Sequence, residues 1–275
     1  MSILALVLFV LGGEGSIAFS TDGSSIQTSF HQLALYLLDD SGHYWMTAAG
    51  VFLLGLFPAL LLLVLALVLL GSRYNFKYIL LGGLGASVVG FGILIITLTQ
   101  TQRGFWSEAR TQSELVIPSN NFDTLSIGLN KVENIWYDAE NDFVFNINEQ
   151  EAQLGQIEFD IKRSPNDSIY LQIIRRAKGS NLEEAKQRAT SIDYSFDLEN
   201  QQLSFNPYFS IYRSDKWRKQ ELEIKLLLPD SQSVYLEKGM ERIIWDIENK
   251  SNTLDQEMPL HIWTMTEEGL ECADC

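Results

Sequence analysis

The chain has 275 residues with a formal net charge of −15, and 46% of its residues are hydrophobic. These totals exclude three classes of protein. An acidic chain without a block of Lys or Arg lacks the basic surface that neutralises nucleic-acid phosphates. Two cysteines are too few for a small disulfide-stapled domain, and the large aliphatic and aromatic content excludes an intrinsically disordered chain.

The charge is distributed unevenly along the chain. Residues 1–104 carry three basic and four acidic side chains, whereas residues 105–275 carry 17 basic and 31 acidic ones. The first part is too apolar for a water-soluble fold, and the second is long enough for one domain. We therefore expect three regions: a partial apolar segment and extracytoplasmic loop over 1–45, a two-helix transmembrane hairpin over 46–103, and an acidic, mainly-β extracytoplasmic domain over 104–275.

The first region begins with an apolar stretch, MSILALVLFVL, that is shorter than a membrane span. It lacks the basic start and the small-residue cleavage site of a secretory signal. We interpret it as the end of a longer transmembrane helix that begins before the numbered chain; a short interfacial segment is the alternative. A second apolar stretch, Phe30–Leu38, with Tyr44 and Trp45, is typical of a short helix at the extracytoplasmic membrane interface.

Two uncharged segments predict transmembrane helices, at about 46–70 and 78–99. At about 1.5 Å per residue, each is long enough to cross a hydrocarbon core of about 30 Å. The turn between them contains Arg73 and Lys77, whereas residues 12–44 contain neither Lys nor Arg. The positive-inside bias places this turn in the cytoplasm, so Arg73 and Lys77 determine the expected topology. The outer ends of the hairpin, and the domain that follows it, are then expected on the other side of the membrane.

The second span contains small residues spaced by four, Gly82, Ala86 and Gly90, a pattern that lets two helices approach closely. We interpret this pattern as a seam that packs against the first span of the same hairpin. Self-association, or docking of a partner helix, is the alternative. Pro58 in the first span is interpreted as a tolerated kink.

After Arg103 the sequence alternates polar and apolar residues with the period of β-strands. One helix is expected after a capping box formed by Ser180 and Glu183, and a second short helix at Glu237–Trp245. The predicted fold class is a membrane α-helical hairpin plus a mainly-β soluble domain, either a β-sandwich or a β-solenoid, with one or two short helices. The expected strands are Glu114–Ile117, Thr124–Leu129, Asp142–Ile147, Gln156–Lys162, Ser168–Arg175, Ser191–Leu198, Gln202–Phe205, Glu221–Leu228 and Ser233–Leu236.

The sequence contains no G-x-S-x-G, H-E-x-x-H or Walker motif. His31 and His43 flank Asp39 and Asp40, but their spacing is not that of a regular metal site, and we interpret them as part of a solvated loop. The acidic run at residues 138–142 lacks the spacing of an EF-hand and is interpreted as a turn. We therefore assign no catalytic, cofactor-binding or metal-binding residues and no cofactor, and we expect a protein that is not an enzyme.

The chain ends in a C-x-x-C motif, Cys272 to Cys275. In an oxidising compartment this pair can form a small-ring disulfide, which we favour; a redox or metal-binding role is the alternative. No helix or βαβ unit follows the first cysteine, so a thioredoxin-like site is not expected. A C-x-x-C supplies two of the four ligands of a tetrahedral zinc, which would need partners such as His261 or a second chain.

Two stretches, ELEIKLLLPDSQSVYLEKGMERIIWDIEN and PLHIWTMTEEGLECADC, together with the layout of hydrophobic segments, resemble the C-terminal portion of PspC-domain membrane proteins. These are envelope-stress regulators of the phage-shock-protein C type, in the long form found in some Gram-negative bacteria. The resemblance runs from about residue 12 to 275 and is strongest over Tyr194–Cys275. The basic PspC module is absent from the sequence, so its regulatory contacts are assigned to no residue here. The acidic domain is also similar in type to the β-rich C-terminal domains of LiaF-type proteins, which are linked to cell-envelope stress.

The resemblance implies a multi-pass bacterial inner-membrane protein, with its C-terminal domain on the periplasmic side, that senses or regulates envelope stress through protein or envelope contacts of that domain. The expected partners are the lipid bilayer and a membrane or periplasmic protein; a homo-oligomer is a further option, and nucleic acid is not expected. Two alternatives remain from the sequence. One is a membrane-tethered thiol-redox or metal-binding protein that uses Cys272 and Cys275, and the other is an adhesin-like structural β domain.

Overall fold

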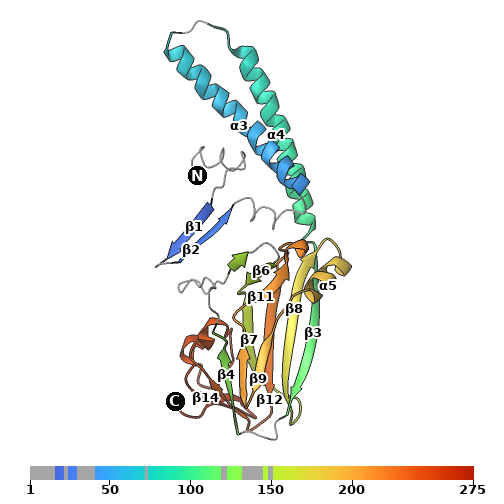
Figure 1. Ribbon diagram of the computed structural model, residues 1–275, viewed down its shortest axis with the longest axis vertical. Helices are drawn as coiled ribbons and strands as arrows, with labels where there is room; N and C mark the ends of the chain where they lie inside the picture. Colours follow the sequence, from blue (N-terminus) through green and yellow to red (C-terminus); the bar gives the residue numbers. More distant parts are fainter. Residues whose placement is uncertain are drawn as a thin grey trace. The chain divides into compact units, whose positions relative to one another are not determined.

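The computed structural model describes residues 16–21, 24–29, 41–71, 74–118, 123–131, 145–147 and 151–275. The chain divides into two compact units, Met1–Phe105 and Trp106–Cys275. Each unit is described by itself below, with the elements labelled as in Figure 1. The expected interfacial helix at Phe30–Leu38, the stretch MSILALVLFVL and the acidic run at 138–142 lie outside the described residues.

The first unit contains a small hairpin and two long helices. Strands β1 (Ser16–Thr21) and β2 (Ser24–Ser29) pair antiparallel, which the sequence did not predict. Helices α3 (Ser41–Leu69) and α4 (Lys77–Arg103) contain 29 and 27 residues, and each is long and apolar enough to cross a membrane. Helix α4 includes the whole expected span, and α3 includes all of its expected span except residue 70. Helix α3 begins five residues before its expected span, and α4 ends four residues after its own, because helical hydrogen bonding extends beyond the apolar run.

Helices α3 and α4 lie side by side and pack through one face of α4 (Figure 1). The buried residues of that face are Gly83, Ser87, Gly90 and Thr97. The closest approach is at Gly90, where a Cβ atom would lie 2.7 Å from the Gly50 carbonyl oxygen. Gly82 is exposed, and a Cβ atom there would meet nothing within 4 Å. Of the expected seam, Gly90 lies in the contact and Ala86 is half-buried, whereas Gly82 lies outside it. The buried face is centred on Gly83, Ser87 and Gly90.

Ser87 also compensates for the proline in α3. Pro58 has no N–H group, so it cannot donate the helical hydrogen bond to the Leu54 carbonyl. The Ser87 hydroxyl lies 3.1 Å from the carbonyl oxygens of both Leu53 and Leu54, and it accepts from the Phe57 N–H at 3.3 Å. A hydroxyl from the neighbouring helix thus reaches the carbonyl that the proline leaves without its usual donor, as proline-containing membrane helices require.

The second unit is mainly β, and the strands among its described residues form three sheets (Figure 1). The four-stranded sheet has the order β3-β8-β12-β7, with β3 at Ser107–Ile117, β8 at Ile169–Gly179, β12 at Glu221–Leu228 and β7 at Ile157–Arg163. The six-stranded sheet has the order β15-β14-β13-β4-β10-β9, with β15 at Gly269–Cys272, β14 at Ile262–Thr266, β13 at Ser233–Leu236, β4 at Thr124–Leu129, β10 at Gln202–Phe205 and β9 at Phe196–Glu199. The three-stranded sheet joins β11 (Phe209–Tyr212), β6 (Glu151–Leu154) and β5 (Phe145–Ile147).

Strands distant in sequence pair in parallel within both large sheets. Strand β4 lies between β10 and β13 and is parallel to both, and β12 is parallel to β7. Such returns of the chain in the same direction are typical of a solenoid-like arrangement rather than of an antiparallel sandwich. The two large sheets share a core, because the rings of Phe159 on β7 and Phe205 on β10 lie 5.4 Å apart between centroids and both are fully buried.

One α-helix packs on the four-stranded sheet. Helix α5 (Leu182–Thr190) buries Ala185 and Ala189, and a Cβ atom at Gly179 of β8 would lie 2.5 Å from the Ala185 nitrogen. The N-cap is Asn181, whose side chain accepts from the Glu184 N–H at 2.9 Å. The expected capping box of Ser180 and Glu183 is thus wrong by one residue, since the sequence offers two overlapping sets of capping side chains.

The other predictions vary in accuracy along the unit. Four expected strands have the observed bounds: β4, β10, β12 and β13. Strand β3 begins seven residues before the expected Glu114, and only the Phe196–Leu198 part of the expected Ser191–Leu198 strand is a strand. The second helix expected at Glu237–Trp245 is reduced to a 3₁₀ turn at Met240–Arg242, where Gly239 has a φ of 101°. Strands β6, β11, β14 and β15 were not predicted.

Candidate functional site

The candidate site lies on the hairpin formed by β14 and β15 at the end of the chain. Cys272 pairs with Trp263 in this hairpin. Trp263 is fully buried, and its indole N–H donates to the Met258 carbonyl oxygen at 2.9 Å, so it anchors the hairpin in the core. Two backbone hydrogen bonds fix the neighbouring residues. The Ala273 N–H donates to the Ile262 carbonyl oxygen at 2.8 Å, and the Leu236 N–H of β13 donates to the His261 carbonyl oxygen at 3.2 Å.

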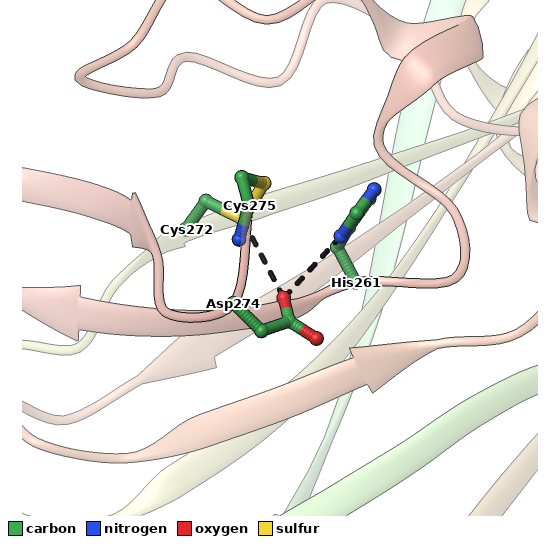
Figure 2. A group of neighbouring side chains, drawn as sticks. All are labelled: His261, Cys272, Asp274 and Cys275. Atoms are coloured by element: carbon green, nitrogen blue, oxygen red, sulfur yellow. Dashed lines mark hydrogen bonds and ion pairs between the residues drawn. A yellow bond between two sulfur atoms is a disulfide. The ribbon is translucent and has the colours of Figure 1, made fainter.

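Cys272 and Cys275 are joined in a disulfide (Figure 2). The hairpin brings His261 and Asp274 beside this bond: His261 Nδ1 lies 3.3 Å from Asp274 Oδ1. The same Asp274 oxygen accepts from the Ile262 N–H at 2.8 Å, so its position is set by the backbone of β14. One nitrogen of His261, one oxygen of Asp274 and the two sulfurs all lie within 4.8 Å of one another.

The other residues singled out from the sequence are not part of this cluster. Lys77 is the first residue of α4, and its ammonium group lies 5.1 Å from the centre of the Tyr78 ring. Arg73, His31, Asp39 and Asp40 lie outside the described residues. His43 bonds Gln100 across the membrane hairpin, with 2.8 Å between its Nε2 and the amide oxygen.

Two open clefts in the β domain also contain charged groups. The larger, of about 450 Å³, is lined by Glu158, Glu221 and Asp255 and has the exposed Trp245 at its wall. Burial, together with repulsion from Glu221 and Glu223, raises the pKa of Glu158. Glu221 is paired with Lys219, and Asp255 accepts backbone N–H groups from Asp246 and Ile247, so both have structural roles.

The smaller cleft, of about 310 Å³, combines Lys162, Arg163 and Lys250 with nearby acidic groups. Each cation already has an acidic partner: Lys162 pairs with Asp160 and Glu248, Arg163 with Asp230, and Lys250 with Glu268 and Glu271. The Asp160 side chain is only 15% exposed, and burial raises its pKa although Lys162 opposes the shift. The cleft is therefore neutralised internally.

The C-terminal cluster was only partly predictable. The sequence indicated the pair Cys272 and Cys275 and suggested His261 as an added partner, but Asp274 was not considered. The signal that places these side chains together is the turn at Glu267–Gly269, where Gly269 has a φ of 121° that favours glycine. That turn sets the register of the hairpin, which carries the chain end back beside His261.

Comparison with known protein families finds a match, and it lies in the β domain. Residues 148–275 match the family model described as ToastRack found in some PspC. No curated protein and no solved structure matches the chain. The matched residues contain ten of the strands, from β6 to β15, and the whole C-terminal cluster. The resemblance to the C-terminal portion of PspC proteins is thus confirmed over residues 148–275, which are similar to the ToastRack domain found in some PspC proteins.

Proposed function

We propose that this chain is a non-enzymatic bacterial inner-membrane protein of the PspC type, which regulates the response to envelope stress through contacts of its β domain. The observation that carries the proposal is the order of two parts in one chain. Two helices long enough to cross a membrane are followed by a domain similar to the ToastRack domain found in some PspC proteins. In this proposal the hairpin is the anchor and the β domain is the part that meets a partner or an envelope component.

The proposed orientation places the β domain in the periplasm. It is supported by Arg73 and Lys77 between the two helices, since short cytoplasmic loops are enriched in basic residues. Aromatic residues at the first turns of α3 also support a membrane interface there, because Tyr44 and Trp45 lie within five residues of the helix start and Trp45 is 60% exposed.

We further propose that the β domain self-associates through the outer edge of β3. Strand β3 is the end strand of its sheet, and among the described residues it pairs only with β8. Its eleven residues pair without a bulge and contain no Pro or Lys, and its charged residues are Glu108, Arg110 and Glu114. Its residues from 112 to 116 are all exposed. A regular edge strand of this length can accept another strand by backbone hydrogen bonds, provided that the charges on the two strands match.

The charges of β3 favour a second copy of the same strand as the occupant. On β8, Arg110 has Arg176 directly opposite, and the acidic group near both arginines in the same sheet is Glu223 of β12. In an antiparallel pair centred on Gln112, Arg110 of one copy lies opposite Glu114 of the other, and the two-fold axis repeats the pair. This register also overlaps all eleven residues. A shift of the centre to Arg110 would place two arginines opposite one another, which is destabilising.

Charge reversal tests the self-association. Analytical ultracentrifugation of the full chain in detergent micelles measures the dimer. In micelles the membrane hairpins of the two copies are free to lie at opposite ends of the paired β3 strands. Arg110→Glu is expected to weaken dimerisation about fivefold or more, because two cross-strand attractions of about 0.2–1 kcal/mol each become repulsions. Arg110→Glu combined with Glu114→Arg should restore it, and Lys186→Glu on exposed helix α5 is the control with the same charge change. A monomeric wild type, or no recovery in the double variant, contradicts the pairing.

A gene deletion tests the proposed function as a whole. The expected result is altered output of envelope-stress genes, restored by the full chain and not by a chain that ends at Phe105. Unchanged output in the deletion would contradict a regulatory role and would favour an adhesin-like structural domain instead. Unchanged output after replacement of Cys272 and Cys275 by Ser would separate this role from thiol chemistry.

A further inference from the structure

The C-terminal cluster has the ligand types of a metal site, although its sulfurs are joined in a disulfide. Two sulfurs, an imidazole and a carboxylate lie within 4.8 Å of one another at His261, Cys272, Asp274 and Cys275 (Figure 2). In a tetrahedral zinc site with bonds of about 2.0–2.3 Å, neighbouring ligand atoms are about 3.3–3.8 Å apart. The widest separation in the cluster therefore exceeds that of a formed site by about 1 Å, and the two bonded sulfurs must move apart.

The cluster combines two residues held by backbone hydrogen bonds with an exposed cysteine. His261 is held through its own carbonyl by Leu236, and Asp274 is held by the Ile262 N–H. Cys275, by contrast, is exposed. His261 directly precedes β14 and Asp274 lies two residues after β15, so backbone hydrogen bonds at the hairpin hold these two ligands while the exposed cysteine adjusts to them once the sulfur–sulfur bond is broken.

We propose that the reduced protein binds one Zn²⁺ through His261, Cys272, Asp274 and Cys275, and that formation of the disulfide releases the ion. Thiolate and imidazole ligands favour zinc over calcium or magnesium, which prefer oxygen. A disulfide sulfur carries no thiolate charge, so the oxidised and reduced states differ sharply in affinity. The inference does not depend on the proposed role in envelope stress.

The redox step balances with a dithiol as the reductant. Its two thiols supply two electrons and two protons, the bond between the Cys272 and Cys275 sulfurs breaks, and the reductant becomes a disulfide. Zinc binding then displaces the two thiol protons, because thiolates are the ligands. In the reverse direction a disulfide oxidant takes two electrons from the thiolates, the sulfur–sulfur bond forms again and the ion leaves.

Metal titration of the full chain in detergent tests the site. The protein is reduced with a phosphine under nitrogen and titrated with Co²⁺, whose thiolate charge-transfer band reports sulfur ligation, and then with Zn²⁺ in competition. We expect one ion per reduced chain, no binding to the oxidised chain, and loss of binding when Cys272 and Cys275 are both replaced by Ser.

Variants of the other two ligands separate a built site from simple thiol binding. His261→Ala and Asp274→Asn are each expected to weaken binding tenfold or more, whereas His43→Ala, at a histidine in the membrane hairpin, should leave it unchanged. If the reduced protein binds no ion, or the oxidised protein binds equally well, the proposal is wrong. It is also wrong if His261→Ala binds as tightly as the wild type, because the cysteines alone then account for the metal.

Discussion

The contact between α3 and α4 at Gly90 allows a sharp test of how the membrane hairpin is packed. In Gly90→Ala the new Cβ atom would lie 2.7 Å from the Gly50 carbonyl oxygen and the Leu54 nitrogen, and 2.8 Å from the Leu53 Cβ. Two of these neighbours are backbone atoms, which cannot turn aside as a side chain can. The helices must therefore separate, and such overpacking costs about 1–3 kcal/mol.

The matched control is Gly82→Ala in the same helix, where the added Cβ meets nothing within 4 Å. Both substitutions share the gain in helix propensity of about 1 kcal/mol, so the difference between them isolates the contact. We expect Gly90→Ala to be less stable than Gly82→Ala by about 1–3 kcal/mol, a factor of about 5 to 150 in the equilibrium constant for helix separation.

The assay follows the two helices directly. Cysteines at the exposed positions Met46 and Thr99 carry a pair of fluorescent dyes, in a chain whose native cysteines are replaced by Ser. Energy transfer between the dyes is measured as SDS is added to detergent micelles, and its loss reports separation of α3 from α4. If Gly90→Ala and Gly82→Ala lose energy transfer at the same SDS concentration, the packing face through Gly83, Ser87 and Gly90 is refuted. The alternative face through Gly82 would then take its place.

Three further predictions concern the β domain, each checked by chemical unfolding of the full chain. Trp263→Phe should cost about 2 kcal/mol or more, since it leaves a cavity and removes a buried hydrogen bond, whereas Trp245→Phe at an exposed site should change stability by less than about 0.5 kcal/mol. Asn181→Ala should cost about 0.5–2 kcal/mol through loss of the α5 cap; no change would contradict the observed N-cap. Burial raises the pKa of Asp160 above its usual value of 3.8, so above pH 3.8 the folded state binds more protons than the unfolded state. The wild type should therefore lose stability relative to Asp160→Asn as the pH rises from 3.8 through the folded-state pKa of Asp160. A stability difference that does not change with pH would contradict that shift.

The sequence predicted those elements whose pattern is set by a strong local constraint. Helices α3 and α4 follow from uninterrupted apolar runs, because a segment of this length without a charge is typical of a helix that can cross a membrane. Strand β12 was predicted with its observed bounds because its side chains alternate regularly, and the structure buries every second residue from Leu222 to Leu228. The protein-wide division into an apolar part and an acidic part required only a charge count.

The missed elements depend on distant partners. Strands β6, β11, β14 and β15 have four or five residues each, too few to show a period, and they are defined by the strands beside them. The helix seam was displaced for a different reason. A spacing of four drifts around a helix of 3.6 residues per turn, whereas the alternating steps of four and three from Gly83 to Ser87 to Gly90 stay on one face.

The topology of the membrane hairpin is the central claim, and cysteine labelling in intact cells measures it most directly. One cysteine is placed at the exposed Lys186 of α5 and another, in a separate chain, at the exposed Asn75 between the helices, with Cys272 and Cys275 replaced by Ser. A maleimide that passes the outer membrane but not the inner one should label position 186 in intact cells and position 75 only after lysis. Labelling of position 75 in intact cells, with position 186 protected until lysis, would contradict a periplasmic β domain.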